Sequence, residues 1–168
     1  MRLQNNVAIV TGAAGGLGEG ISLSLASEGA HVVVCDLNLA QAEKVAEKIR
    51  ATGQQAIAHR ADVTKAEDCE QTITATLDHF SRLDTLVCNA GVDGLPTENP
   101  ATPPLLENLL EDDWDIVMEV NLKGVFCPAA RQYRTLRSKA AAESLTFLQS
   151  RDARGSSFYL PMLHPKRL

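Results

Sequence analysis

Long apolar runs are missing from this sequence of 168 residues, and their absence limits the kind of protein it can encode. The apolar runs that do occur are short: Val7–Val10, Val32–Cys35 and Leu86–Cys88. None approaches the length that crosses a bilayer. The opening residues 1–6 also lack the apolar core of a secretory signal. We therefore expect no membrane association and a cytoplasmic location.

Cysteine is scarce and never occurs as a C-x-x-C pair. The four cysteines lie far apart, and none has a histidine at metal-ligand spacing: Cys35, Cys69, Cys88 and Cys127. Cytosolic thiols stay reduced, so a disulfide framework is not expected either. The pattern predicts free, mostly buried thiols and no metal site.

Basic residues are few in the first three quarters of the chain and in excess afterwards. Residues 1–127 contain 8 Lys and Arg against 19 Asp and Glu, whereas residues 128–168 contain 8 against 2. A reversal of this kind usually marks a tail. Scattered basic residues without interleaved aromatic side chains do not indicate a nucleic-acid partner. We predict one domain over residues 1–127, followed by an atypical basic tail over residues 128–168 that is not a separate domain.

Strand and helix patterns alternate along the first part of the chain. Four segments are predicted as strands: Val7–Val10, His31–Asp36, Gln55–Ala61 and Leu86–Cys88. Helices are expected between them, the first two ending at Gly29 and Gly53, and the third opened by a capping box of Thr64 and Glu67. The alternation predicts an α/β fold: a Rossmann-like doubly wound parallel sheet, incomplete with about four strands, and an atypical helical or irregular C-terminal tail.

Two more segments follow the fourth predicted strand. Residues 92–110 contain four prolines and are predicted to form a long irregular loop. Residues 111 to about 126 have a helical pattern. The apolar residues predicted to face the sheet from this helix are Trp114, Val117, Met118 and Leu122.

A glycine cluster, residues 11–18, stands between the first strand and the first helix. A pyrophosphate can bind there on exposed helix N–H groups. Asp36 ends the second strand 18 positions after Gly18, close to the spacing of about 20 at which an acid meets the adenosine ribose. Its charge would repel a 2′-phosphate, which favours NAD over NADP. The alternatives are a purely structural turn and a surface acid.

These motifs resemble the short-chain dehydrogenase/reductase family. The family's Thr-Gly-x-x-x-Gly-x-Gly turn is matched by Thr11, Gly12, Gly16 and Gly18. Three further segments match in the family's order: Asp62-Val63, Asn89-Ala90-Gly91 and residues 121–126. The resemblance implies a cofactor site that also includes Leu17, with Asp62 and Val63 at the adenine and Asn121 in the active site. Cys88 departs from it, because the family usually has an asparagine there.

The resemblance also implies catalytic residues that the sequence does not supply. The family uses a serine on a fifth strand and a tyrosine followed four residues later by a lysine. Here Tyr133 is followed by Arg137, and Tyr159 by Leu163. Tyr133 follows Asn121 too closely for an intervening strand, so we interpret it as a solvated helix residue. The resemblance is expected to end at about residue 126.

Three functional hypotheses follow. The first is a truncated NAD(P)-dependent oxidoreductase of the short-chain type that transfers a hydride between nicotinamide and an alcohol or ketone. The second is a module that binds a dinucleotide without turnover, and the third is an inactive fragment. The expected partner is a small-molecule alcohol or ketone substrate, and the chain is expected to form a homo-oligomer.

Overall fold

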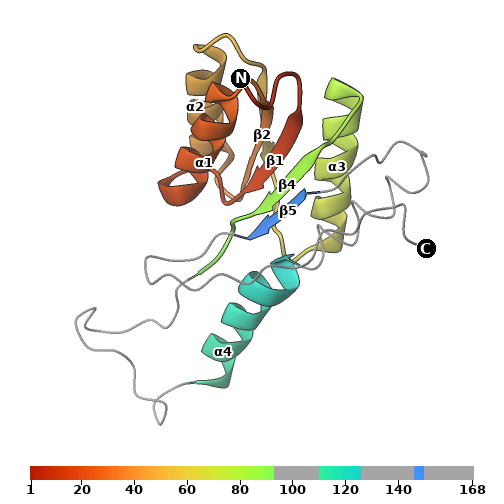
Figure 1. The fold of residues 1–168 in the computed structure, drawn as a ribbon. Coiled ribbons are helices and arrows are strands. Elements are labelled where there is room, and N and C mark those ends of the chain that lie inside the picture. The colour runs from red at the N-terminus through yellow and green to blue at the C-terminus, as the bar shows by residue number, and fades with distance from the viewer. Residues whose placement is uncertain (93–109, 126–145, 150–168) are drawn as a thin grey trace.

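The computed structural model describes residues 1–92, 110–125 and 146–149, which form a parallel sheet flanked by helices (Figure 1). The elements follow in the order β1 (Val7–Thr11), α1 (Gly16–Ser27), β2 (His31–Asp36), α2 (Leu39–Arg50), β3 (Ala56–Arg60), α3 (Ala66–Phe80), β4 (Thr85–Cys88), α4 (Glu111–Met118), the π-helical turn η2 (Glu119–Lys123) and β5 (Thr146–Gln149). Among the described helices, none is long and apolar enough to span a membrane.

The strands lie in the order β3-β2-β1-β4-β5, and each neighbouring pair is parallel. The chain moves outward from β1 to β3 and then returns to the other side of β1 with β4. In sheets of this kind, ligands bind outside the carboxyl ends of the strands at the point where the order reverses. The topology therefore marks the carboxyl ends of β1 and β4 as the place for a site.

Helices cover both faces of the sheet, with α1 and α2 on one face and α3 on the other (Figure 1). All five residues of β1 are buried. Its Val10 belongs to the cluster that packs on Val45 and Ile49 of α2, whereas Ile9 belongs to the cluster that packs on Ile73 of α3. Strands buried on both faces explain why the sequence shows continuous apolar runs here rather than alternation. The predicted α/β Rossmann-like class is confirmed.

The predicted capping box at the start of α3 is wrong. The helix begins at Ala66 after an N-cap at Lys65, and no side chain caps it. The Thr64 hydroxyl instead donates to Asp62 Oδ1 at 2.7 Å. The N-cap position is occupied by Lys65 rather than Thr64, so the Thr64 hydroxyl does not cap the helix and the spacing of Thr64 and Glu67 misleads.

The sheet has one strand more than the four predicted. β5 pairs in parallel with β4, with Thr146 opposite Thr85 and Gln149 opposite Cys88. It lies within residues 128–168, for which we predicted only a helical or irregular tail. The pairing of β5 is long-range, since it depends on β4 presenting a free edge, and a four-residue strand leaves little pattern in the sequence.

The predicted packing of residues 111–125 is also wrong. The helix forms and continues through η2, but α4 buries none of its residues. Trp114 and Leu122, which were expected to face the sheet, are 53% and 61% exposed. Among the described residues the helix extends away from the sheet (Figure 1), and only its last residues, Gly124 and Val125, are buried. Helical period predicts which residues share a face, but not what that face contacts.

Candidate dinucleotide-binding site

The glycine turn between β1 and α1 lies at the carboxyl edge of the sheet. Gly12 and Gly16 adopt left-handed backbone conformations with φ of +62° and +55°, which residues with a side chain disfavour. The N-cap of α1 is Gly15, and no side-chain hydrogen bond caps this helix. The amide groups of the first turn of α1 are therefore available to an anion.

Two glycines of the turn lie too close to neighbouring atoms to carry a side chain. A Cβ on Gly12 would lie 2.7 Å from the Cα of Ala90, and one on Gly18 would lie 2.8 Å from the Cα of Ala13. At Gly20, two residues further along α1, a Cβ would have nothing within 4 Å. Glycine is therefore a packing requirement at positions 12 and 18, and not at position 20.

The carboxylate of Asp36, at the end of β2, contacts the glycine turn. Its Oδ2 accepts a hydrogen bond from the backbone N–H of Ala14 at 3.0 Å, and its Oδ1 accepts one from Asn38 at 2.9 Å. A carboxylate oxygen can accept more than one hydrogen bond, so both oxygens retain acceptor capacity. The structure thus fixes the orientation of Asp36 beside the turn.

Thr11 and Asn89 join the ends of β1 and β4. Thr11 Oγ1 accepts hydrogen bonds from the backbone N–H groups of Asn89 and Ala90, both at 3.1 Å. In return, the side-chain amide of Asn89 donates to the carbonyl oxygens of Thr11 at 3.0 Å and Gly12 at 2.9 Å. These reciprocal bonds hold the glycine turn against the Asn89-Ala90-Gly91 segment.

Asp62 and Val63 follow β3 at the same edge. The Thr64 hydroxyl holds the pKa of Asp62 below its ordinary value, helped by the Thr64 backbone N–H and by the charge of Lys65, while burial opposes the shift. Asp62 is therefore ionised at neutral pH. Val63 is 8% exposed and contacts Gly124. The pair presents a fixed negative charge beside a small apolar surface.

Asn121 lies within η2 and binds the backbone of Val92. Its Oδ1 accepts from the Val92 N–H and its Nδ2 donates to the Val92 carbonyl, both at 2.8 Å. The two bonds fix the residue that directly follows Asn89-Ala90-Gly91. A π-helical turn inside an α-helix often occurs at functional sites. Here it presents the Asn121 amide to the end of β4.

Cys88 ends β4 and is buried, with 2% of its surface exposed. Its thiol donates to the carbonyl oxygen of Val125 at 3.8 Å. Burial raises the pKa of Cys88 well above its ordinary value, so the thiol stays neutral and is not a nucleophile. A weak thiol bond therefore stands where the family pattern usually has an asparagine.

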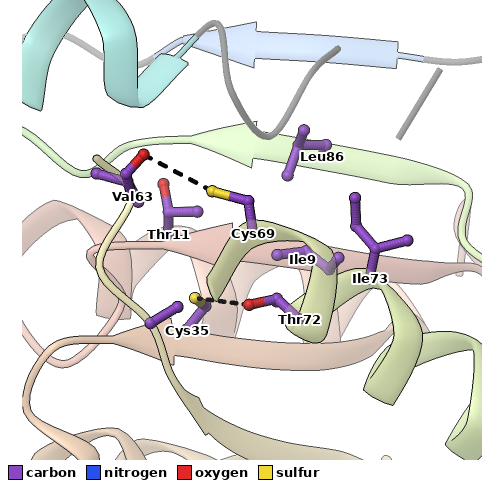
Figure 2. Close-up of a pocket in the computed structure, with 9 residues that line it drawn as sticks. Ile9, Thr11, Cys35, Val63, Cys69, Thr72, Ile73 and Leu86 are labelled. Atoms are coloured by element: carbon purple, nitrogen blue, oxygen red, sulfur yellow. Dashed lines mark hydrogen bonds between the residues drawn. The ribbon is translucent and has the colours of Figure 1, made fainter. Parts of the chain in front are cut away.

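A small cavity lies in the interior between the sheet and α3 (Figure 2). Its volume is about 10 Å³, the space of one water molecule. The thiols on its wall have partners of their own: Cys35 Sγ lies 3.9 Å from Thr72 Oγ1, and Cys69 Sγ donates to Val63 O at 3.7 Å. The cavity is too small for an organic ligand. A dinucleotide would have to bind outside this cavity, at the carboxyl ends of the strands.

The predicted site residues come from five separate parts of the chain and gather at this edge: Thr11, Gly12, Gly16, Leu17, Gly18, Asp36, Asp62, Val63, Asn89, Ala90, Gly91 and Asn121. Leu17 is 58% exposed there. No cluster of three or more metal-ligating side chains occurs in the described part of the chain. Tyr133, Arg137, Tyr159 and Leu163 lie outside the described residues. Val92 and Gly124 were not predicted as site residues, because their contacts with Asn121 and Val63 join distant parts of the chain and leave no local pattern in the sequence.

A parallel sheet with a glycine turn at its reversal point defines a Rossmann-like α/β protein. The family model described as short chain dehydrogenase matches residues 6–150. The chain belongs to this family. The match extends past residue 126, where we expected the resemblance to end, and it includes β5.

Individual relatives agree with the family match. The chain is 41% identical over 143 residues to a 3-oxoacyl-[acyl-carrier-protein] reductase of Synechocystis, covering 82% of this chain and 53% of that protein. It is 38% identical over 138 residues to a hydroxynaphthalene reductase-like protein of Metarhizium robertsii, covering 81% and 48%. A crystal structure of a 3-ketoacyl-ACP reductase from Sinorhizobium meliloti superposes with a TM-score of 0.75 at 29% identity, covering 85% and 52%. The chain spans about half the length of the curated relatives it matches.

Proposed function

We propose that this chain binds NAD at the carboxyl edge of its sheet and acts in an oxidoreduction of the short-chain dehydrogenase type. The supporting observation is the glycine turn with Asp36 fixed against it by the Ala14 N–H at 3.0 Å. The reaction would transfer a hydride between the nicotinamide and an alcohol or ketone. The names of the Synechocystis and Sinorhizobium meliloti reductases refer to 3-oxoacyl and 3-ketoacyl substrates, which supports a ketone as the substrate class.

The residues at the edge fit a dinucleotide in distinct ways. Because Gly12 and Gly18 have no side chains, the backbone of the turn is not covered there. The uncapped start of α1 suits a pyrophosphate. Asp36 has acceptor capacity for the ribose hydroxyls. We propose Asp62 and Val63 for the adenine, Asn89-Ala90-Gly91 for the backbone wall of the site, and Asn121 for the active site. When bound, NAD would supply or accept the hydride.

Paired glycine variants of α1 test cofactor binding directly. Gly18→Ala would place a methyl group 2.6 Å from Asn89 Nδ2, whereas Gly20→Ala would meet nothing within 4 Å. We expect the Gly18 variant to bind NADH at least about tenfold more weakly, since overpacking typically costs more than 1 kcal/mol. The Gly20 variant should bind like the unmodified chain. Titration by nicotinamide fluorescence measures both. An absence of saturable binding at millimolar NADH in the unmodified chain would contradict the proposal.

Asp36 is proposed to select NAD. A 2′-phosphate on the adenosine ribose would approach a carboxylate that already lies against the turn, and like charges repel. NADH should therefore bind more tightly than NADPH, and Asp36→Asn should reduce the ratio of the two affinities. Tighter binding of NADPH by the unmodified chain would overturn this assignment.

Turnover separates an enzyme from a binding-only module. The sequence contains no tyrosine followed four residues later by lysine, which favours the module as the alternative. The serine that the family has on its fifth strand has a candidate in Ser150, which follows β5 in the sequence. Measurement of NADH absorbance at 340 nm with a panel of ketones and alcohols decides the question. Binding of NADH without any turnover would support the module.

The remaining features belong to the same proposal. We propose a cytoplasmic location, a homo-oligomeric state, and a domain over residues 1–127 followed by a basic tail that adds β5 to its sheet. Cell fractionation, analytical ultracentrifugation and limited proteolysis would test them in turn.

A further inference from the structure

The segment that holds Asn121 is attached to the rest of the described structure at a few points. α4 buries none of its residues, and the described apolar side chains Trp114, Ile116 and Leu122 are each more than half exposed. Gly124 and Val125, at the end of the segment, are buried. The segment therefore meets the sheet mainly through its C-terminal residues.

Two contacts hold that end in place. Val125 packs in the cluster beneath α3, and its carbonyl oxygen accepts the thiol bond of Cys88. Gly124 contacts Val63: a Cβ at position 124 would lie only 2.6 Å from Val63 Cγ2 and 3.3 Å from Val63 Cβ. The backbone of the segment thus packs directly on a β-branched side chain with no space for a methyl group between them.

Local backbone geometry does not explain glycine at this position. Gly124 has φ of −62° and ψ of −18°, values that any L-residue adopts in a helix. Helix propensity alone would favour alanine. The close approach to Val63 is what excludes a side chain. Val63 is stiff at χ1 because it is β-branched, so it cannot easily turn away.

We propose that Gly124 is a positioning residue that sets the distance between Val63 and Asn121, and thereby couples the adenine side of the site to the Val92 clamp. A side chain at position 124 would move the end of η2 away from Val63. Asn121, three residues earlier on the same turn, would then lose its alignment with the backbone of Val92, to which it makes two bonds of 2.8 Å. The coupling to the cofactor depends on the proposed NAD site, whereas the coupling to Val92 does not.

Amide exchange at Val92 tests the structural part without any cofactor. The Val92 N–H donates to Asn121 Oδ1, so its hydrogen–deuterium exchange reports whether the clamp is closed. We expect exchange at Val92 to be about tenfold faster in Gly124→Ala than in the unmodified chain, which corresponds to about 1.4 kcal/mol. Asn121→Ala provides the exchange rate of the open clamp. Gly20→Ala, which adds the same methyl group where nothing lies within 4 Å, should leave the rate unchanged.

A second substitution distinguishes a specific clash from general damage. Val63→Ala removes the Cγ2 atom that the added methyl group would meet, so the double variant Val63→Ala/Gly124→Ala should exchange Val92 within about twofold of Val63→Ala alone. Because Val63 belongs to the proposed adenine contact, NADH binding by the double variant is compared with Val63→Ala alone, and the two should bind NADH about equally. If Gly124→Ala does not fold, Val63→Ile provides a second test. The larger side chain at position 63 should crowd Gly124 and make hydrogen exchange at Val92 faster.

The outcomes are separable. Unchanged exchange at Val92 in a folded Gly124→Ala, or a double variant no better than Gly124→Ala, overturns the inference. If NADH does not bind to the unmodified chain while the exchange rates behave as described, the proposed function fails and the positioning role of Gly124 stands.

Discussion

In the β1-α1-β2 unit nearly every strand residue is buried, whereas in α4 none is. Both regions contribute to the same edge of the sheet. The unit is held by apolar burial on both faces of its strands, so the glycine turn and Asp36 rest on a rigid base. The segment from α4 to Val125 is held by a few specific contacts at one end. The difference shows that one site can combine a part fixed by its core with a part fixed by individual bonds.

The largest expected difference between the two regions comes from removing apolar volume from each of them. Ile9→Ala in β1, where Ile9 is 1% exposed, should lower the free energy of unfolding by about 2–5 kcal/mol because it leaves a cavity in the core. Ile116→Ala in α4, where the side chain is 56% exposed, should change it by less than about 0.5 kcal/mol. Urea denaturation measures both. Equal losses would show that α4 is packed as firmly as β1.

The next effect concerns the bonds between β1 and β4. Thr11→Val keeps the shape of the side chain but leaves the N–H groups of Asn89 and Ala90 without their acceptor. We expect a loss of about 1–3 kcal/mol in the free energy of unfolding. Thr11→Ser retains the hydroxyl and should lose less. If both variants lose the same amount, the methyl group of Thr11 matters more than its hydroxyl.

The smallest effect is a pH dependence at Asp62. Because the Thr64 hydroxyl lowers the pKa of Asp62 in the folded state, this bond stabilises the fold above about pH 4, the usual range of an aspartate, and is lost as the pH falls through the lowered value. Thr64→Val should return the pKa toward its ordinary value and weaken this acid dependence. Asp62 is partly exposed, so the change should stay below about 1 kcal/mol. Carboxyl NMR titration follows it, and an unchanged pKa in the variant would contradict the assignment.

The buried thiol of Cys35 in β2 should be unreactive while the chain is folded. Burial raises the pKa of Cys35 to about 12, and its thiol contacts Thr72. Iodoacetamide at pH 8 should therefore leave Cys35 unmodified in the folded chain and label it in urea, because the reactive thiolate is absent until unfolding. Labelling followed by mass spectrometry of the peptide that contains Cys35 measures this. Rapid labelling of the folded chain would show that β2 opens more readily than the burial of its side chains implies.

The class of fold and most residues of the candidate site could be predicted from local patterns in the chain. Apolar runs at residues 7–10 and 32–35 predict buried strands because a strand covered on both faces needs such side chains, and glycine spacing predicts the turn because only glycine adopts φ near +60° freely. The position of Asp36 could be predicted because it is the last residue of a predicted strand. These are local relations between residues close in the chain.

The other features depend on the tertiary structure. β5 forms because β4 has an edge to pair with. The exposure of Trp114, the clamp of Asn121 on Val92 and the contact of Gly124 with Val63 each depend on where a distant segment lies. Such contacts join residues far apart in the sequence. Local propensity carries no information about their separation, so no pattern within a single element could have predicted them.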